Sequence, residues 1–366
     1  MKILVAINQS RVLYDFKREV VESFASLGHD TLLSYLPDFR GSYFEQRQFK
    51  IIPAPLEPRG MNPIKDARLY RYYCRLLKRE RPDVVFTFTI KPNVYCGYAC
   101  RRLGAPYWGT ISGLGEAVHA RGPLGALSTW LYRQGLCGAR GVFCQNDAIV
   151  DFALQHGLTT PERVIRVNGS GVNLQYHTYQ PYPSEEDGVK ILLPARLTPA
   201  KGVREFLATA RRFHEREPNV RFQIMGAPET GSSLFETVQS AALRGEIEYL
   251  GYQTDPRPYY ASASAVALPS YHEGLSNVLL EGAATGRPLL ASNVPGCAET
   301  FIEGQTGFGF AARDAQAFCQ AVERFVRTPR FERESMGRRG REYVAARFDR
   351  REAARVYVAA LEGINR

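Results

Sequence analysis

The stretch "GVKILLPARLTPAKGVREF", residues 188–206, contains the unit from which the fold can be predicted. It opens with a short apolar run, passes through a loop that contains Pro199, and enters a helical pattern at Gly202. Alternation of strand and helix indicates βαβ units, and strands that are apolar almost throughout indicate parallel sheets covered on both faces. The stretch therefore predicts a doubly wound α/β domain.

The same alternation extends over the rest of the chain. Short apolar runs in the first half predict strands at "MKILVAIN", "HDTLLSYL", "PDVVFTFT", "APYWGTIS" and "RGVFCQN". Those in the second half predict strands at "GVKILLPA", "VRFQIMG", "IEYLG", "SAVALPS" and "RPLLASN". Longer helical patterns separate these runs, so we expect two doubly wound α/β domains.

The length of the chain also suits two domains, because 366 residues exceed what one ordinary core accommodates. The boundary is expected between "VIRVNGSGVN" (164–173) and "YQPYPSEEDG" (179–188), where apolar periodicity stops and turn residues collect. Beyond about Phe310 the sequence is rich in Ala, Glu and Arg and predicts helix.

Composition and charge narrow the class of protein. The hydrophobic share of 45% and the charged share of 23% are typical of a soluble globular protein. A formal charge of +10 and a pI near 9.3 favour an anionic partner. Charge alone does not choose among nucleic acid, an acidic membrane surface and a phosphorylated substrate.

The cysteines and the first residues bear on the compartment. The seven cysteines form no Cys-x-x-Cys pair and have no neighbouring His at metal-ligand spacing, so a reducing compartment fits best. The start, "MKILVAIN", is too brief an apolar run for a signal peptide or a bilayer span. We therefore expect a first buried strand there, in a cytoplasmic chain.

Loops that follow strands are the places to search for chemistry, because ligands of α/β proteins bind at the carboxyl ends of strands. After "KILLPA", Arg196 and Lys201 flank a Pro-containing turn, and Gly202 opens the next helix. Two cations beside a helix N-terminus suit a diphosphate, because the N–H groups and the helix dipole already favour negative charge. An exposed basic loop explains the same residues equally well.

A second loop of this kind lies in "SYHEGLSNVLLEGAATGRP", residues 270–288. It follows the strand "SAVALP", Gly274 permits a tight turn, and Ser276 or Asn277 is able to cap a helix that begins at "VLLEGAAT". The sequence thus predicts a strand, a tight turn and a helix N-terminus in immediate succession.

Two glutamates flank this turn. Glu273 is expected in the loop and Glu281 about one turn into the helix, while the N–H groups of residues 275–278 would face a phosphate. A molecule with hydroxyls on either side of a diphosphate is a nucleotide sugar. The alternative is that Glu281 is a favourable acidic residue near a helix start and Glu273 a solvated loop residue.

The set "ARLTPAKG…FQIMG…YLG…LPSYHEGLSNVLLEGAATGRPLLASNVPGCAE" resembles the retaining glycosyltransferases of family 4, which includes glycogen synthase, sucrose synthase and bacterial mannosyltransferases. The family's hallmark is a Glu-x7-Glu pair, matched by Glu273 and Glu281 over a resemblance that spans roughly residues 189–310. It implies the GT-B fold, in which two Rossmann-like domains face each other across a cleft. Residues 1–172 would bind the acceptor, residues 173–347 would bind the nucleotide sugar, and a final helix, about 348–366, would cross back to the first domain.

The resemblance also implies roles for single positions, without a metal or a cofactor. The matching positions are Arg196 and Lys201 for the diphosphate, Glu281 for the ribose, Glu273 beside the donor sugar, Gly274, Leu275, Ser276 and Asn277 for the phosphate-facing backbone, and Tyr249 and Leu250 for the base. Arg196, Lys201 and Glu273 would be the catalytic residues.

The first half resembles a narrower group that extends polyprenyl-diphosphate-linked sugars in capsule, exopolysaccharide and bacterial N-glycan assembly. The resemblance rests on "RGMNPIKDARLYRYYCRLLKRERPDVVFTFTIKPNVYCGYACRRLGAPYWGTISGLGEA". It implies a hexosyl or N-acetylhexosaminyl donor, with UDP favoured over GDP. The positions on the acceptor side are Arg59, Asn62, Lys65, Lys91, Gly113 and Gly115.

One departure concerns the reacting sugar. Many members of the family carry a His-Gly pair where this chain has Ser112 and Gly113, and nothing places the nearby His119 in the cleft. No catalytic histidine is therefore assigned. Retention by double displacement and by same-face attack both stay open from the residues, and the resemblance favours same-face attack with Glu273 as an orienting group.

The helix expected at "IKDARLYRYYCRLLKR" carries cations at helical spacing and an apolar face opposite them. Such a helix suits anionic lipid on the inner face of the cytoplasmic membrane, although an ordinary solvated face explains it nearly as well. Three other functions are alternatives. A nucleic-acid module has no recognised motif here, an epimerase shares the architecture but not the Glu-x7-Glu set, and a transferase with a soluble acceptor is the runner-up.

Overall fold

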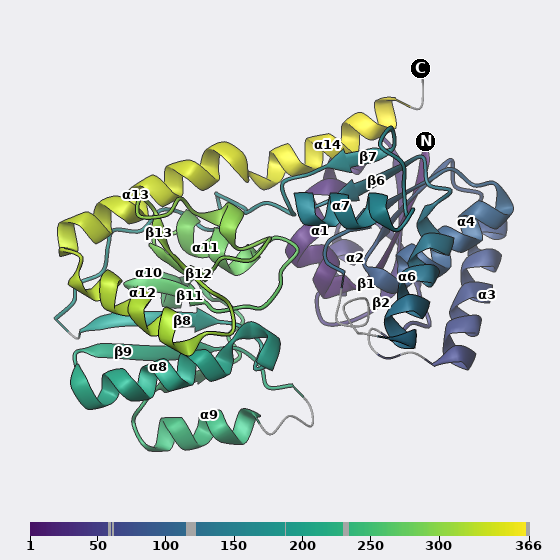
Figure 1. Ribbon diagram of the computed structural model, residues 1–366. Coiled ribbons are helices and arrows are strands. Elements are labelled where there is room, and N and C mark those ends of the chain that lie inside the picture. Colours follow the sequence, from purple (N-terminus) through teal and green to yellow (C-terminus); the bar gives the residue numbers. More distant parts are fainter. Residues whose placement is uncertain (58–59, 61, 115–121, 187, 230–233, 364–366) are drawn as a thin grey trace. The chain divides into compact units, whose positions relative to one another are not determined.

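The computed structural model describes residues 1–57, 60, 62–114, 122–186, 188–229 and 234–363. The chain divides into two compact units, which are coloured along the sequence in Figure 1. The N-terminal unit comprises Met1–Ser170 and Arg350–Arg366, and the C-terminal unit comprises Gly171–Asp349. The chain changes unit after Ser170 and again after Asp349, where the sequence interpretation had residues 172 and 347.

The N-terminal unit is built on a parallel sheet of seven strands. In spatial order these are β3 (Lys50–Pro53), β2 (Asp30–Leu36), β1 (Lys2–Gln9), β4 (Val84–Phe88), β5 (Tyr107–Ile111), β6 (Gly141–Cys144) and β7 (Val164–Arg166). In the register, Leu4 of β1 pairs with Leu32 on one side and with Val85 on the other. The strand order reverses between β1 and β4, which makes this the topological switch point of the unit.

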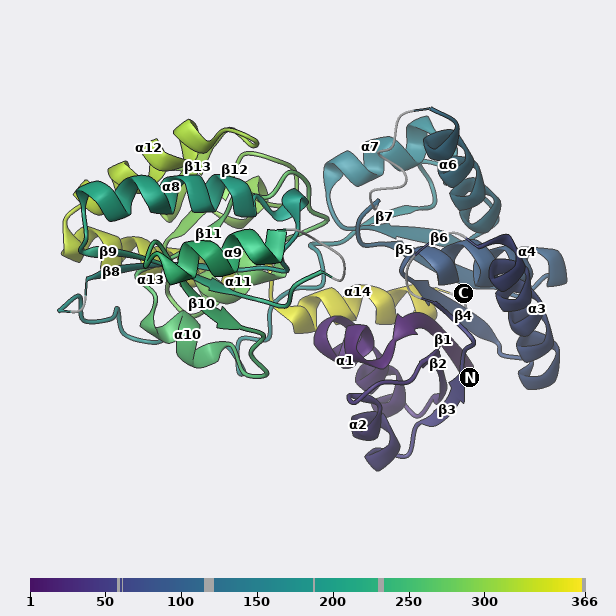
Figure 2. The ribbon, with the colours of Figure 1, turned by 90° about the horizontal axis from the view of Figure 1, so that it is seen from below.

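Helices cover both faces of this sheet because alternate strand residues point to opposite sides. Leu4 and Ala6 pack in one core, and Ile3 and Val5 pack in the other. One layer contains α3 (Pro63–Glu80), a π-helical turn (Pro92–Cys96), α4 (Gly97–Leu103), α6 (Pro123–Leu136) and α7 (Asp147–Gln155). The other contains α1 (Ser10–Ser26), α2 (Gly41–Gln46) and α14 (Arg350–Glu362), with α14 alongside α1 in Figure 2.

The C-terminal unit has a parallel sheet of six strands. In spatial order these are β10 (Glu248–Gly251), β9 (Val220–Met225), β8 (Val189–Pro194), β11 (Ala265–Leu268), β12 (Leu289–Ser292) and β13 (Gly307–Phe310). Its helices are α8 (Val203–Arg216), α9 (Leu234–Leu243), α10 (Arg257–Ser262), α11 (Asn277–Ala284), α12 (Ala315–Arg327) and α13 (Arg330–Arg347). Here the strand order reverses between β8 and β11.

The predicted fold class is confirmed, and every strand quoted from the sequence is present. The helical reading beyond Phe310 is also confirmed by α12, α13 and α14. The prediction missed the short strands β3, β7 and β13 at the sheet edges. Their signals are weak for local reasons, since β7 has only three residues and β13 contains Gly307 and Gly309.

Candidate functional site

The switch point of the C-terminal unit brings together two of the loops that the sequence singled out. Arg196 and Lys201 lie after β8, and Glu273 lies after β11. Because β8 and β11 are neighbouring parallel strands, both loops leave the same edge of the sheet. Ligands of doubly wound sheets bind at such an edge.

Gly202 fixes the approach of these two loops. It follows a short 3₁₀ turn, Pro199–Lys201, and adopts a left-handed conformation with φ of 69°. A Cβ atom here would lie only 2.0 Å from the carbonyl oxygen of Pro269. Only glycine therefore permits this contact, and α8 begins directly after it.

The two cations of the first loop are placed differently. Lys201 Nζ forms an ion pair with Glu273 Oε1, and both side chains are largely buried. Arg196 is exposed and forms no ion pair with any residue in the described part of the chain. One cation is thus held in place, and the other can reach a ligand in solvent.

The turn over residues 274–277 ends at the N-terminus of α11. Ser276 is the N-cap residue, but its side chain makes no capping bond. Its Oγ atom and the Oδ1 atom of Asn277 are buried without a hydrogen-bond partner in the ranges that the structure describes. Buried polar atoms normally have a partner, so a hydroxyl and an amide oxygen left unpaired at a helix N-terminus mark a place for polar groups of a ligand.

The backbone of this turn departs from the sequence interpretation in one respect. The prediction that all the N–H groups of residues 275–278 face a phosphate is wrong for Ser276, whose N–H donates to the oxygen of Gly296 at 2.8 Å. Gly296 has φ of 82°, and a Cβ atom there would lie 2.6 Å from the oxygen of Gly274. The segment after β12 therefore supports the turn from behind.

Glu281 lies one turn into α11, as predicted, and has partners of its own. The hydroxyl of Tyr260 donates to its Oε2 atom at 2.8 Å, and His177 Nε2 lies 3.9 Å from Oε1. Burial first, and then the nearby Glu281, raises the pKa of Tyr260 well above 10, so the phenol stays protonated and remains a donor. Tyr260 and His177 thus orient the Glu281 carboxylate. An acidic residue that only stabilises the start of a helix would not need such partners.

The sequence interpretation missed Tyr260 and His177. Tyr260 is fully buried on α10, and the carbonyl oxygen of His177 accepts from Arg341 at 2.6 Å. No spacing rule connects these residues with Glu281, and the pairing depends on how α10 and the chain near residue 177 pack against α11. The pattern of "RPYYAS" predicts only that Tyr260 packs in the hydrophobic core, and Tyr260 does belong to that core.

The predicted base-binding residues belong to β10 at the edge of the sheet. Both Tyr249 and Leu250 are partly exposed and pack against the core with the rest of their side chains. The hydroxyl of Tyr249 donates to the oxygen of Gly226 at 2.8 Å, and its ring centroid lies 5.9 Å from that of Phe235. Tyr249 is therefore fixed at the end of the strand.

The predicted acceptor residues of the N-terminal unit are largely engaged within the protein. Lys91 is buried after β4, and its Nζ atom lies 2.9 Å from Asp66 Oδ1. The side chain of Asn62 caps α3 by accepting from the N–H groups of residues 64 and 65, each at 3.1 Å. Lys65 forms an ion pair with Glu57 at the surface. Each of these contacts supports the local structure.

The remaining acceptor positions follow β5 or lie outside the described residues. Gly113 is described directly after β5, whereas Arg59, Gly115 and His119 fall outside the described residues. Near Gly113, the carboxyl edge of β4 is strained, since the β-branched residue Thr89 adopts φ of 69° and precedes the π-helical turn. Both features are frequent at functional sites.

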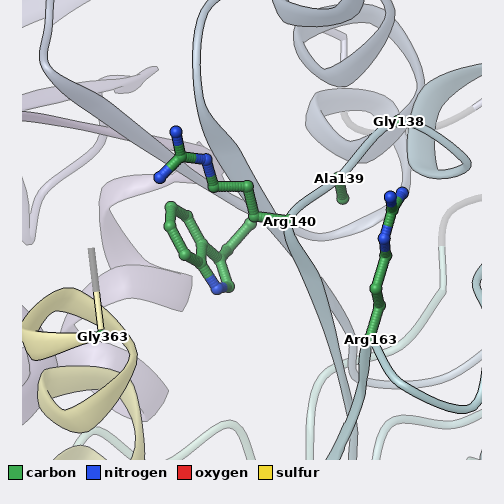
Figure 3. Close-up of a pocket in the computed structure, with 6 residues that line it drawn as sticks. Gly138, Ala139, Arg140, Arg163 and Gly363 are labelled. Carbon is green, nitrogen blue, oxygen red and sulfur yellow. The ribbon is translucent and has the colours of Figure 1, made fainter. Parts of the chain in front are cut away.

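A cavity of about 370 Å³ lies at the amino ends of the strands in the sheet of the N-terminal unit (Figure 3). Trp108, Arg140 and Arg163 line it, at the amino ends of β5, β6 and β7. The guanidinium groups of Arg140 and Arg163 do not converge on one point in Figure 3. The cavity thus lies away from the loops that follow the strands.

Within the described residues, no group of three or more His, Cys, Asp or Glu side chains is arranged to hold a metal ion. None of the helices described is long and apolar enough to cross a membrane.

The family comparison agrees with the division into two units. Residues 188–328 match the family described as "Glycosyl transferases group 1". Residues 17–169 match the family described as "Glycosyl transferase 4-like domain". The chain belongs to glycosyltransferase family 4. The resemblance read from the Glu-x7-Glu pair is thereby confirmed.

Individual relatives of this glycosyltransferase are distant in sequence. The capsular polysaccharide biosynthesis glycosyltransferase CapM of Staphylococcus aureus is 25% identical over 224 residues, which cover 57% of this chain and 59% of CapM. The N,N'-diacetylbacillosaminyl-diphospho-undecaprenol alpha-1,3-N-acetylgalactosaminyltransferase of Campylobacter jejuni is 21% identical over 328 residues, 85% of each chain. The chain thus spans about three fifths of CapM.

Solved structures agree on the fold of the glycosyltransferase. Anabaena Alr3699/HepE, solved in complex with UDP and glucose, superimposes with a TM-score of 0.81 at 16% identity and covers 99% of both chains. The crystal structure of a glycosyltransferase from Rickettsia africae gives a TM-score of 0.80 at 17% identity, over 100% of this chain and 99% of that one. The predicted GT-B fold is confirmed.

Proposed function

We propose that this glycosyltransferase moves a hexosyl or N-acetylhexosaminyl group, with retention, from a UDP-linked nucleotide sugar to a polyprenyl-diphosphate-linked saccharide. The acceptor would belong to bacterial surface polysaccharide or glycan assembly at the inner face of the cytoplasmic membrane. The observation that carries the proposal is the switch point of the C-terminal unit. There the ion pair of Lys201 and Glu273 lies beside the α11 N-terminus with its unpaired Ser276 and Asn277 side chains.

The donor site follows from these groups. Ser276 Oγ can donate to a phosphate oxygen next to the positive end of the α11 dipole, and the unpaired Oδ1 atom of Asn277 can accept from a hydroxyl of the donor. Arg196 supplies an exposed guanidinium, which binds phosphate through two parallel hydrogen bonds. Glu281, oriented by Tyr260, accepts hydrogen bonds from the ribose hydroxyls, and Tyr249 and Leu250 contact the base.

The chemistry needs stabilisation of the leaving diphosphate. As the bond from the anomeric carbon to the phosphate oxygen breaks, positive charge develops on the sugar and negative charge on the diphosphate. Arg196, Lys201 and the α11 N-terminus stabilise that negative charge. An acceptor hydroxyl attacks from the same face, and its proton passes to the leaving phosphate. Glu273, neutralised by Lys201, orients the sugar and does not attack it.

The lipid-linked acceptor is supported by two relatives and by charge. The printed name of the Campylobacter relative specifies a diphospho-undecaprenol acceptor, and that of CapM specifies capsular polysaccharide biosynthesis. The net charge of +10 suits an anionic acceptor and an anionic membrane surface. Asn62, Lys65 and Lys91, with Arg59, Gly113 and Gly115, would form the acceptor side.

The test is a pair of transfer assays with a panel of UDP- and GDP-sugars, preceded by a thermal-shift screen to find the donor. One acceptor is a lipid-diphosphate sugar, and the other is the same sugar without phosphate. We expect transfer to the lipid-diphosphate sugar at least tenfold faster, with the anomeric configuration of the donor retained in the product. Equal use of the bare sugar, or inversion, contradicts the proposal.

A transferase with a soluble acceptor is the second candidate. It is favoured by the engagement of Lys91 and Asn62 within the N-terminal unit, since the Lys91 ammonium is paired with Asp66 and the Asn62 side-chain oxygen caps α3. Preference for the bare sugar in the same assay selects this candidate.

A further inference from the structure

The outward face of α6 is apolar over its first turns. Leu124, Leu127 and Trp130 follow one another at helical spacing and are 49%, 46% and 54% exposed. No charged residue occurs from position 122 to position 132. A surface helix of a globular protein normally presents polar side chains to solvent. The apolar side chains on this face of α6 therefore mark it as a candidate interaction surface.

The packing of α6 prevents this face from turning inward. Ser128, Tyr132 and Leu136 are buried on the opposite side. Gly135 touches the π-helical turn so closely that a Cβ atom would lie 2.2 Å from the oxygen of Asn93. The leucines and Trp130 therefore point outward because the backbone of α6 is fixed against the layer below.

Exposed cations lie on α6 itself and on the two helices that follow it in the same layer. Helix α6 packs against α4, and α4 packs against α3, in the same layer on the sheet (Figures 1 and 2). The outer side of α3 carries Arg68, Arg71 and Arg75, all exposed. The acid within the first turn of α3, Asp66, is buried against Lys91, so it does not offset these charges at the surface. The next cations in the layer are Arg101 and Arg102 of α4 and Arg133 of α6, which are exposed too.

An apolar face in a layer of helices that carries exposed arginines matches one kind of partner. Leucine and tryptophan side chains gain free energy in the boundary between headgroups and acyl chains, and arginines bind the phosphates of anionic lipids. A second copy of the chain fits poorly, because a symmetric contact through this face would place like charges opposite each other.

We propose that the face formed by Leu124, Leu127 and Trp130, the α6 face, inserts into an anionic bilayer. The arginines of α3 and α4 then contact the lipid headgroups. The inference deepens the proposed function and rests on it in one respect, since a polyprenyl-linked acceptor has to be met at a bilayer.

Trp130 provides a direct measurement, because the chain has two tryptophans and the other, Trp108, is buried. The probes are vesicles of phosphatidylglycerol with phosphatidylethanolamine, and vesicles of phosphatidylcholine alone. We expect the emission of the full-length chain to shift to shorter wavelength with the anionic vesicles. The shift should be absent in Trp130→Phe.

Partitioning of variants tests the face itself. Leu124→Ser/Leu127→Ser should bind anionic vesicles at least tenfold more weakly, and each of Arg68→Gln, Arg71→Gln and Arg75→Gln about fivefold more weakly. The matched control is Leu243→Ser/Phe331→Ser, which removes two apolar side chains that are 90% and 74% exposed in the C-terminal unit and should change nothing. Thermal unfolding of each variant confirms that it is folded.

Three results would overturn the proposal: unchanged vesicle binding by the leucine variant, equal loss in the control, or an emission shift that follows protein concentration without vesicles. The last result would assign the face to a second copy. Transfer onto a lipid-diphosphate sugar with a short, water-soluble chain is measured separately. If the wild type binds vesicles but does not use this acceptor, the proposed acceptor is wrong, whereas the proposal that the α6 face inserts into a bilayer is still supported.

Discussion

The charged residues at the topological switch points of the two units differ in how far they are exposed to solvent. Between β8 and β11, Arg196 is exposed and Lys201 pairs with Glu273 across two loops, so the charges stay within reach of a ligand. Between β1 and β4, Lys91 is buried against Asp66, and each of the two side chains is only 10% exposed. The same strand order thus supports an open set of charges in one unit and a closed pair in the other.

This difference shows that topology places loops at an edge but does not decide whether their charges serve a ligand or the fold. Burial decides, because a charge taken out of water must be paired. The predictions below test the contrast, beginning with the largest expected effect.

The buried pair of Lys91 and Asp66 is the first test. Lys91→Ala leaves a buried carboxylate without its partner and should lower the free energy of unfolding by about 3–5 kcal/mol, measured by urea denaturation. The double variant Lys91→Met/Asp66→Asn removes both charges and should recover most of this loss.

The double variant also separates the two roles of Lys91. If Lys91 contacts the acceptor diphosphate, the stable double variant binds nucleotide sugar normally but transfers poorly to the lipid-diphosphate sugar. If transfer recovers together with stability, Lys91 acts in the fold alone, and the contrast between the two switch points becomes sharper.

The charges of the open switch point should affect turnover, and Lys201→Ala should also lower stability because it leaves the largely buried Glu273 without its partner. Arg196→Ala and Lys201→Ala are each expected to lower kcat by about 10²-fold or more, because they remove stabilisation of the leaving diphosphate. Arg221→Ala, an exposed arginine on β9, is the control. Wild-type kcat in either site variant would remove that residue from the diphosphate site.

Glu281 and its partner test whether the carboxylate is prepared for a ligand. Glu281→Ala should weaken donor binding by about 1.5–3 kcal/mol through loss of hydrogen bonds to a charged acceptor, as measured by calorimetry. Tyr260→Phe removes only the orienting hydroxyl and should cost about 0.5–1.5 kcal/mol. A donor affinity unchanged by Glu281→Ala would exclude the carboxylate from the site.

Lys17 offers a pH-dependent test of how burial affects a charge in the N-terminal unit. Its ammonium is buried, bonds the hydroxyl of Tyr357 on α14 at 3.1 Å and lies over the rings of Phe88 and Tyr357. Burial first, and then Arg350, lowers the pKa of Lys17 from 10.5 to about 7, against the opposing effect of Glu19. The folded protein therefore binds fewer protons than the unfolded chain between about pH 7 and 10.5.

It follows that this group makes the protein more stable as pH rises through that range, by at most about 1.4 kcal/mol per pH unit. Below about pH 7 its contribution is constant, since both states are protonated. Lys17→Met should flatten the dependence when unfolding is followed from pH 7 to 9. Equal slopes in wild type and variant would show that Lys17 keeps its ordinary pKa.

The sequence by itself determined what depends on neighbours along the chain. Apolar runs and helical periods predicted the central strands and the fold class, because a strand or a helix face repeats every few residues. The position of Glu281 one turn into α11 followed from the same local geometry. The edge strands β3, β7 and β13 were missed because their short segments carry little of this repeating signal.

Tertiary structure decided which polar groups meet. Tyr260 and Glu281 are 21 positions apart, and Lys91 and Asp66 are 25 apart, so no local period connects either pair. The hydrogen bond from Ser276 to Gly296 likewise appears only when β11 and β12 lie side by side. The outward direction of the α6 face was set by the close contact of Gly135 with the layer below. The partners, burial and exposure of a side chain depend on packing between segments that are distant in the sequence. For that reason the sequence predicted which residues belong to the candidate site, and only the tertiary structure showed which contacts they make.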